Sequence, residues 1–277
     1  MKEKRLFKFG ILALSIVLIA CTGGSAEAGC PEIDGREINV VATTPMIGEF
    51  VSQVGGDNIN LTVLMPAEAD PHNYDPAPQD AGTIADADLV FYTGLKYEPA
   101  ALVKLLENSA CSAEVLAEVG ENVFPIEFKE GGHDDHHDEH AGHDHGAYDP
   151  HFWFDPNRVA YAAEYIESKL VEFDPSNASE YEAAGKAYVT ELKGLVGQVS
   201  ELISTIPSQN RKLITTHESL GYLEAKFGLE VLSTIIPSLD SANEISPSQL
   251  VGVIDVIEDN NVKAVSYTHL RAHETLH

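Results

Sequence analysis

The sequence has few basic residues and no apolar segment long enough to cross a membrane. Its 277 residues include 17 Lys and Arg against 44 Asp and Glu, a formal net charge of −27. We therefore expect no nucleic-acid partner, because binding to phosphates relies on clustered Lys and Arg. The most apolar segment, residues 9–20, has 12 residues, whereas a membrane-spanning helix needs about 20.

Cysteine is also scarce, which argues against a fold held together by many disulfides. The chain has three cysteines, Cys21, Cys30 and Cys111. Outside the cytoplasm Cys30 and Cys111 could form a disulfide between the N-terminal segment and the first lobe, predicted below at residues 37–155. Two cysteines alone do not fix a pairing. Hydrophobic residues make up 44% of the chain, enough for the core of one large or two medium domains.

The first 21 residues have the pattern of an export signal. Four basic residues among the first eight precede the apolar segment, which ends in Leu18-Ile19-Ala20-Cys21, an order typical of signal peptides. This ending resembles a lipoprotein processing site, with Cys21 as the lipidated first residue and residues 22–36 as a linker. We therefore expect an extracytoplasmic protein, in the periplasm or at the outer cell surface, that a lipid holds to the membrane.

Strand and helix patterns alternate along residues 37–155, the predicted N-terminal lobe. Strands are expected at 37–42, 59–65 and 89–92, with helices at 46–54 and 77–87. Such alternation predicts an α/β fold in which helices cover a parallel sheet, and ligands bind beyond the carboxyl ends of its strands.

Residues 156–206 have uninterrupted helical spacing, first to residue 173 and then from 176 to 206. Each helix follows an Asp-Pro pair, a common signal for a helix start. In the second helix, apolar residues spaced by threes and fours form one stripe: Tyr181, Ala184, Tyr188, Leu192, Leu195, Val199, Leu202 and Ile206. We predict a rigid helix packed along both of two lobes in a monomer; a coiled-coil dimer is the alternative.

Alternation resumes in residues 207–265, the predicted C-terminal lobe. Strands are expected at 212–215 and 230–235, helices at 222–227 and 247–258, and a further strand begins at 263. Residues 266–277 do not continue the pattern, and we interpret them as a non-native tract rather than a natural tail. The histidines within this tract are set aside on that ground: His269, His273 and His277.

Two copies of the tripeptide Asp-Pro-His are the most informative motif, at Asp70-Pro71-His72 and Asp149-Pro150-His151. Proline fixes its own φ and pushes the preceding residue into extended conformation, so each imidazole is oriented before a ligand arrives. Preorganised imidazoles suit a zinc-class cation. The alternative is that Asp-Pro is ordinary turn chemistry and each histidine is incidental, but the repetition favours metal binding.

His217 is a third candidate ligand because it also follows a predicted strand. Zinc favours three or four protein ligands in tetrahedral arrangement, and three histidines from separate loops could close such a site between two lobes. Taken alone, each of these histidines would more often be structural.

The motifs around these histidines occur in a fixed order, with His217 inside Thr215-Thr216-His217-Glu218-Ser219. Together they resemble the solute-binding proteins of zinc and manganese ABC transporters, from about residue 38 to residue 264. The resemblance implies two α/β lobes joined by one long helix, a metal in the cleft between the lobes, and an ABC permease as partner. It maps the first three ligands onto His72, His151 and His217. Manganese-binding members often have a carboxylate at the third position, whereas three nitrogen donors suit Zn²⁺ better than Mn²⁺.

At the position of the fourth ligand, this sequence departs from the pattern of that family. Relatives commonly supply Asp or Glu after a late strand, which should follow Val265. We expect that this ligand is missing and that affinity is weakened or altered; the alternatives are water, Glu218 or Asp70, or a histidine from a nearby loop.

That loop, residues 130–149, is rich in histidine and in acidic residues. It contains seven acidic and no basic residues, so we expect a mobile segment. His-rich tracts can bind metal, and zinc-transporting members of the family often carry one, which favours a weak auxiliary zinc site over a solvated linker. Its six histidines are His133, His136, His137, His140, His143 and His145.

We therefore predict an extracytoplasmic zinc-binding receptor that delivers Zn²⁺ to a permease and catalyses nothing. A manganese or iron receptor of the same family is the alternative. A zinc hydrolase would also hold zinc with three histidines and a water, but we identify no His-Glu-x-x-His pairing on a predicted helix, and Glu218 is a weak general base. A metal-containing adhesin, active in cell adhesion, is a third interpretation.

Overall fold

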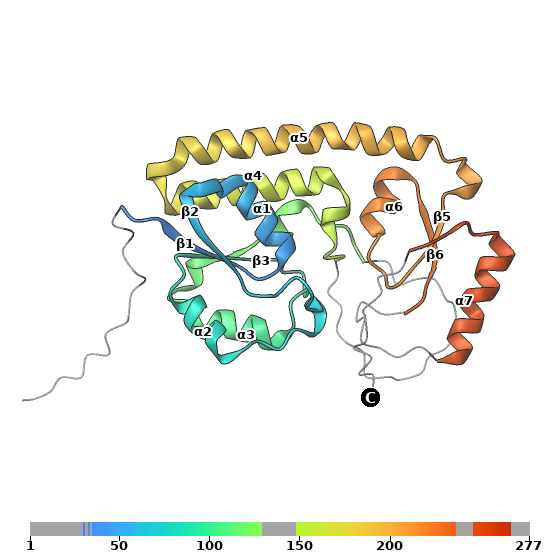
Figure 1. The fold of residues 1–277 in the computed structure, drawn as a ribbon, viewed down its shortest axis with the longest axis horizontal. Coiled ribbons are helices and arrows are strands. Elements are labelled where there is room, and N and C mark those ends of the chain that lie inside the picture. The colour runs from blue at the N-terminus through green and yellow to red at the C-terminus, as the bar shows by residue number, and fades with distance from the viewer. Residues whose placement is uncertain (1–29, 31–32, 34, 129–147, 237–245, 267–277) are drawn as a thin grey trace, which may run out of the picture.

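The computed structural model describes residues 30, 33, 35–128, 148–236 and 246–266. Two α/β lobes lie side by side beneath one long helix that runs along both (Figure 1). Within the described ranges, no helix combines the length and the apolar character needed to cross a membrane. The two-lobe α/β architecture predicted from the sequence is confirmed.

The N-terminal lobe contains a four-stranded parallel sheet. Its strands are β1 (Ile38–Ala42), β2 (Ile59–Val63), β3 (Leu89–Tyr92) and β4 (Leu116–Glu118). They lie in the order β2-β1-β3-β4. The central strands β1 and β3 are almost wholly buried, because helices cover both faces, as parallel sheets require.

Four helices supply these two covers (Figure 1). On one face lie α1 (Pro45–Gly55) and α4 (Pro156–Phe173); on the other lie α2 (Pro78–Ala85) and α3 (Ala100–Ser109). Alternate residues of β1 therefore enter two separate apolar clusters: Val40 packs with residues of α1 and α4, and Val41 packs with residues of α2 and α3. The lobe has a core on each side of its sheet.

The long helix α5 (Ala178–Ser204) has 27 residues and extends about 40 Å. Its first half buries Tyr181, Val189 and Leu192 against the N-terminal lobe. The helix also contacts α6 (Gly221–Phe227) of the C-terminal lobe, as predicted, but its second half is less buried: Leu195 is 40% exposed and Leu202 is 68% exposed. There the stripe faces fewer neighbours, so only some of its residues are half-buried.

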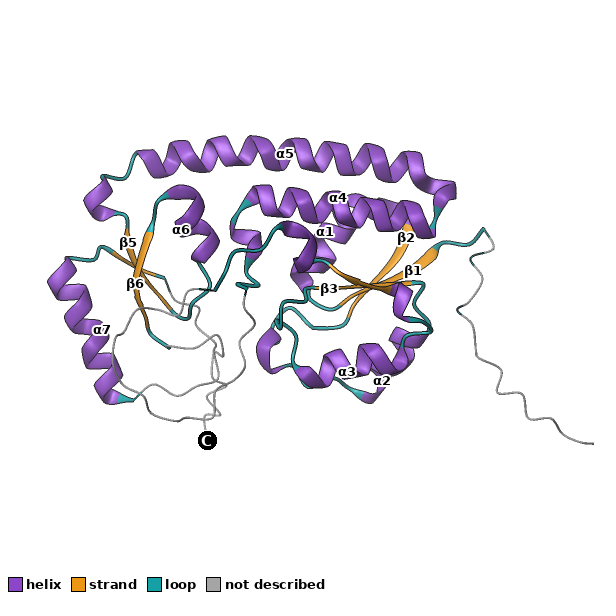
Figure 2. Cartoon of the chain, turned by 180° about the vertical axis from the view of Figure 1, so that it is seen from behind, coloured by secondary structure: helices purple, strands orange, loops and turns teal. Residues whose placement is uncertain are grey.

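The C-terminal lobe has a three-stranded parallel sheet in its described part. Its strands β5 (Lys212–Thr215), β6 (Glu230–Thr234) and β7 (Ala264–Val265) lie in the order β6-β5-β7. Helix α6 (Gly221–Phe227) lies between this sheet and α5, and α7 (Pro247–Asn260) lies on the opposite side (Figure 2). These elements agree with the sequence prediction.

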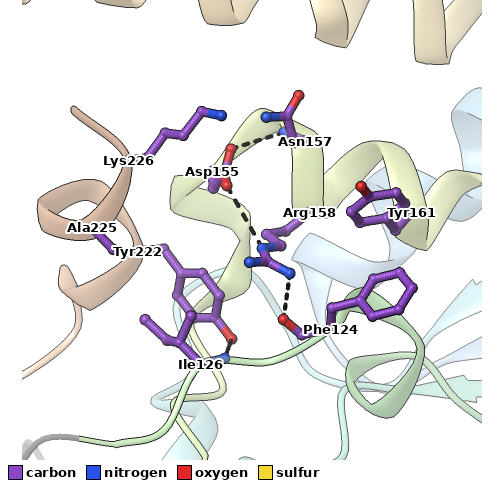
Figure 3. A pocket seen from close by; sticks show the side chains of 9 residues that line it. All are labelled: Phe124, Ile126, Asp155, Asn157, Arg158, Tyr161, Tyr222, Ala225 and Lys226. Carbon is purple, nitrogen blue, oxygen red and sulfur yellow. Dashed lines mark hydrogen bonds and ion pairs between the residues drawn. The ribbon is translucent and has the colours of Figure 1, made fainter.

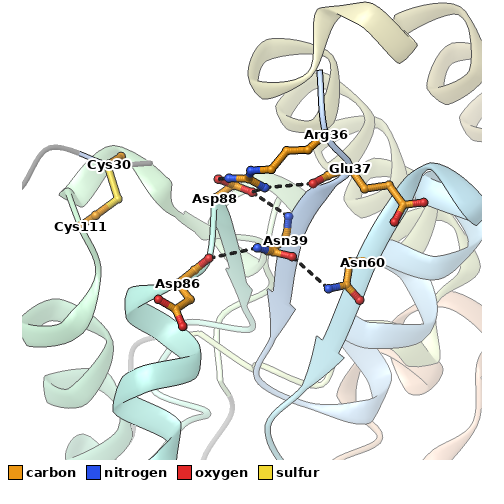
Figure 4. Close-up of polar contacts among 8 residues, drawn as sticks. All are labelled: Cys30, Arg36, Glu37, Asn39, Asn60, Asp86, Asp88 and Cys111. Carbon is orange, nitrogen blue, oxygen red and sulfur yellow. Dashed lines mark hydrogen bonds and ion pairs between the residues drawn. A yellow bond between two sulfur atoms is a disulfide. The ribbon is translucent and has the colours of Figure 1, made fainter. Parts of the chain in front are cut away.

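A disulfide and an ion pair secure the start of the N-terminal lobe (Figure 4). Cys30 and Cys111, the candidate pair named from the sequence, form a disulfide across 81 residues. Arg36 donates two hydrogen bonds of 2.6 Å to the buried carboxylate of Asp88. Asp88 also accepts a bond from the backbone of Asn39, so the chain entering β1 is held at several points.

Candidate metal centre

The three predicted histidines come from three different loops of the two lobes. His72 lies in the short 3₁₀ helix η2 (Pro71–Asn73), in the connection after β2. His151 directly precedes η5 (Phe152–Phe154), which leads into α4. His217 follows β5 of the other lobe. Two candidate ligands therefore belong to the N-terminal lobe and one belongs to the C-terminal lobe.

The structure brings these three side chains together. One ring nitrogen from each of His72, His151 and His217 lies within 4.8 Å of the other two. The ring centroids are 5.4–5.9 Å apart. Zn–N bonds of about 2.0–2.1 Å place tetrahedral imidazole nitrogens about 3.4 Å apart. Small side-chain movements would therefore suffice to bring all three onto one ion.

The repeated Asp-Pro-His motif forms the same backbone turn twice. The carboxylate of Asp70 accepts the backbone N–H of His72 at 3.1 Å, and that of Asp149 accepts the backbone N–H of His151 at 2.9 Å. In an Asx turn, the side chain of Asp accepts a hydrogen bond from the backbone N–H two residues later, as it does here. The preorganisation predicted from proline therefore depends equally on the aspartate of each motif, a role that the sequence interpretation missed.

In the second copy the aspartate carboxylate also contacts the histidine ring. Asp149 Oδ1 lies 2.8 Å from His151 Nδ1, and both side chains are buried. A carboxylate at this nitrogen fixes the ring so that Nδ1 carries the proton and Nε2 presents its lone pair. His151 Nε2 is buried without a hydrogen-bond partner, a costly state for a polar atom. A bound metal ion would satisfy it.

His217 is held in the uncharged form that metal binding needs. Burial, together with the neighbouring His151, lowers the pKa of His217 to about 4, against a smaller opposing effect of Asp70 and Asp149. Neutral imidazole is the ligand form. The hydroxyl of Thr215 donates to the backbone carbonyl of His217 at 2.8 Å, which helps to fix the loop after β5.

Two aromatic side chains border the histidines. The ring of Tyr97 lies 4.7 Å from that of His72 and 5.7 Å from that of His151, both edge to face. The ring centroid of Trp153 lies 5.4 Å from that of His151 and 5.2 Å from that of Tyr97. Tyr97 is only 8% exposed. These rings therefore pack against the imidazoles on one side of the site.

The loop that presents Tyr97 has an unusual backbone. Gly94, Leu95 and Lys96 all have positive φ, a conformation that costs free energy at residues other than glycine. Two carboxylates hold it: Glu98 accepts the N–H groups of Thr93 and Gly94, and Glu118 accepts that of Leu95. Tyr97 was not predicted as part of the site, and no motif marks it.

Other candidate residues are not part of this group. Within the described ranges no carboxylate joins the three histidines, and Asp70 instead caps η2 through His72 and Asn73. Cys21 and the six histidines of residues 133–145 lie outside the described residues. So does His273-Glu274-Thr275-Leu276-His277, a His-Glu-x-x-His spacing in the tract that the sequence interpretation set aside.

Comparison with known proteins gives one family and a consistent set of relatives. The sequence model of a family described as the periplasmic component A of a zinc-uptake complex matches residues 40–275. The manganese-binding lipoprotein MntA of Halalkalibacterium halodurans is 27% identical over 263 residues, covering 95% of this chain and 80% of that protein. The manganese ABC transporter substrate-binding lipoprotein PsaA of Streptococcus anginosus is 29% identical over 267 residues, covering 95% and 81%.

Solved structures agree with this assignment. A crystal structure of ZnuA superposes with a TM-score of 0.69 at 26% identity, covering 83% of this chain and 90% of that one. The periplasmic zinc-binding protein TroA from Treponema pallidum superposes with a TM-score of 0.68, covering 83% and 78%. At 24% identity the likeness to TroA is one of fold alone.

Proposed function

We propose, from the premise that this chain belongs to the family of periplasmic zinc-uptake component A proteins, that it captures Zn²⁺ for an ABC transporter. Membership of that family makes the chain a metal-binding receptor of an ABC transporter and not an enzyme. The choice of zinc as the cargo is our own proposal.

The donor set carries the proposal of zinc. The group formed by His72, His151 and His217 supplies three imidazole nitrogens, and no carboxylate among the described residues joins them. Imidazole donors suit Zn²⁺, whereas Mn²⁺ prefers oxygen donors. The unpartnered, buried Nε2 of His151 and the uncharged His217 are both suited to hold the ion. We leave the fourth position to an oxygen donor, either water or a carboxylate.

Manganese is the second candidate because of the names of similar proteins. MntA and PsaA are both described as manganese proteins. A manganese receptor would need oxygen ligands from outside the described residues, in addition to the histidines. Iron is the third possibility within this family.

The remaining parts of the proposal concern place and partners. A lipid on Cys21 would hold the receptor outside the cytoplasm beside its permease, in keeping with the lipoprotein names of MntA and PsaA. We propose that the His-rich residues 130–149 gather zinc weakly and that the cluster of three histidines binds it tightly. Deletion of residues 132–145 should then remove weak sites and leave one tight site.

Metal competition tests the cargo directly. The chain is equilibrated with equal concentrations of Zn²⁺, Mn²⁺ and Fe²⁺, separated from free metal and analysed by mass spectrometry for its metal content. We expect one zinc per chain, and its loss in His151→Ala. Retention of manganese or iron in place of zinc would refute the argument from the donor set. Turnover of ester, peptide or phosphate substrates by the zinc-loaded chain would contradict a receptor.

A further inference from the structure

We infer that Gly221 and Tyr222, at the start of α6, are positioning residues for His151. They belong to the C-terminal lobe and contact Asp149, the residue that orients the His151 ring. Through them, the position of the C-terminal lobe would determine how well His151 is oriented for metal. The inference rests on the proposed metal site and adds residues that do not themselves contact the ion.

Tyr222 joins the two lobes through its hydroxyl group. The side chain is 1% exposed, and the hydroxyl donates to the backbone carbonyl of Asp149 at 2.7 Å while it accepts the N–H of Ile126 at 3.3 Å. Ile126 lies shortly before the His-rich residues 130–149, and Asp149 is the last residue of that range. One buried hydroxyl therefore fixes the backbone two residues before His151 to the other lobe. Figure 3 shows the bond of the same hydroxyl to Ile126.

The surroundings of Tyr222 make this contact important. Beside it lies a pocket of about 410 Å³, lined by residues from both lobes, and the Tyr222 ring itself packs with the apolar core of the N-terminal lobe. Arg158 approaches the Tyr222 ring at 6.0 Å from its centroid. The guanidinium is itself held by the backbone carbonyls of Val123 and Phe124. The ring is thus seated against a fixed cation of the N-terminal lobe (Figure 3).

Gly221 contacts the side chain of the same aspartate. A Cβ added at this glycine would lie 2.6 Å from Asp149 Oδ2, closer than a carbon and an oxygen can approach. The carboxylate has little freedom to move away, because its Oδ1 holds both the backbone N–H and the ring Nδ1 of His151. A methyl group at residue 221 would therefore displace the carboxylate from the His151 ring or push α6 away.

The C-terminal lobe consequently reaches the metal centre twice. It supplies His217 directly, and four residues later it presses Gly221 and Tyr222 against Asp149. Separation of the lobes would withdraw one ligand and release the support of a second in one movement. This arrangement links metal release to lobe movement.

Two substitutions with matched controls test the inference. Gly221→Ala should displace the Asp149 carboxylate, and Tyr222→Phe should remove only the hydroxyl. Gly194→Ala in α5 is the control for the first, since an added Cβ there meets nothing within 4 Å. Tyr181→Phe is the control for the second, because it also loses a buried hydroxyl bond, of 2.7 Å to Asp174, away from the histidines. Each chain is measured for zinc affinity and, with Co²⁺ in place of zinc, for its visible absorption spectrum.

We expect Gly221→Ala to weaken zinc binding by roughly 10- to 100-fold, the usual effect of losing a residue that orients a metal ligand, and to alter the cobalt bands. Tyr222→Phe should give a smaller change in the same direction, and both controls should bind like the parent chain. In an Asp149→Ala background, Gly221→Ala should cause little further loss, because its target is already gone.

Parental affinity and spectra in both Gly221→Ala and Tyr222→Phe would overturn the inference, as would an undiminished effect of Gly221→Ala in the Asp149→Ala background. In either case the parent chain would still lose zinc on His151→Ala, and the proposed function would stand. If His151→Ala left zinc binding unchanged, the proposed metal site would be wrong and the inference would fall with it.

Discussion

The two lobes hold their parts of the candidate metal centre differently. The N-terminal lobe has apolar clusters on both faces of a four-stranded sheet and supplies His72 and His151, each with its backbone N–H bonded to an aspartate. The described part of the C-terminal lobe has three strands, and its helix α7 exposes Leu250, Val251 and Ile254 at 44–56%. It supplies His217 alone. The difference suggests a preformed half-site that the second lobe completes.

Helix α5 is likewise well buried over the N-terminal lobe and more exposed over the C-terminal lobe. The same substitution made in each half tests this contrast and has the largest expected effect. Leu192 is 7% exposed over the N-terminal lobe, whereas Leu202 is 68% exposed on the same helix. Leu192→Ala should lower the free energy of unfolding by about 2–5 kcal/mol through loss of buried contacts and a cavity. Leu202→Ala should change it by less than about 0.5 kcal/mol. Urea denaturation of both variants measures this; equal losses would erase the contrast.

Removal of the single ligand that the C-terminal lobe supplies should reduce the free energy of zinc binding by nearly as much as Leu192→Ala reduces the free energy of unfolding. Zinc sites bind with about 10–16 kcal/mol over four ligands, or about 3 kcal/mol for each. We therefore expect His217→Ala to weaken zinc binding at least about 100-fold, as should His72→Ala. Competition with a chelator of known affinity measures both. If only the histidines of the N-terminal lobe mattered, the idea of a shared site would be wrong.

The pH dependence of the stability of the metal-free chain tests the contribution of the C-terminal lobe, because His217 belongs to that lobe. Because the pKa of His217 is lowered to about 4 in the folded chain, the unfolded chain binds the extra proton between pH 6.5 and 4, and stability falls as the pH drops through this range. Urea denaturation at pH 7.5 and 5 should show a loss of about 2 kcal/mol from this group. His217→Gln should lack that part of the loss; an identical pH dependence in the variant would contradict the assignment.

The smallest predicted effect concerns the aspartate of the second Asp-Pro-His, within the half-site of the N-terminal lobe. Asp149 bonds to the ring of His151 as well as to its backbone. Asp149→Asn should weaken zinc binding about tenfold, since the amide is a weaker acceptor for the ring, while Asn still caps the turn. Titration calorimetry measures the change, and parental affinity in the variant would mean that Asp149 acts mainly on the backbone.

Much of this architecture could be predicted from the sequence because its signals are local. The apolar runs that became β1, β3 and β5 each stand beside a helical pattern, and this alternation specifies a parallel sheet. The three histidines could be identified because each follows a strand or an Asp-Pro pair. Helix α3 and strand β4 were not predicted, and β4 has only three residues at the edge of its sheet, too few for a clear periodic signal.

The features that were missed depend on contacts between distant segments. Tyr97 reaches His72 from a loop 25 positions later in the chain, and no spacing rule connects them. The end of burial in α5 could not be predicted from its stripe, since Leu192 and Leu202 continue the same pattern and differ only in what lies beneath them. The contact of Asp149 with the ring of His151 depends on a side-chain conformation that the motif allows but does not require.

X-ray absorption at the zinc edge tests most directly whether both lobes bind one ion. The account predicts scattering from three imidazoles at about 2.0–2.1 Å in the zinc-loaded parent chain. It predicts two imidazoles in His72→Ala and two in His217→Ala. A parent chain with fewer than three imidazoles on zinc, or a His217→Ala spectrum identical to that of the parent, would contradict it.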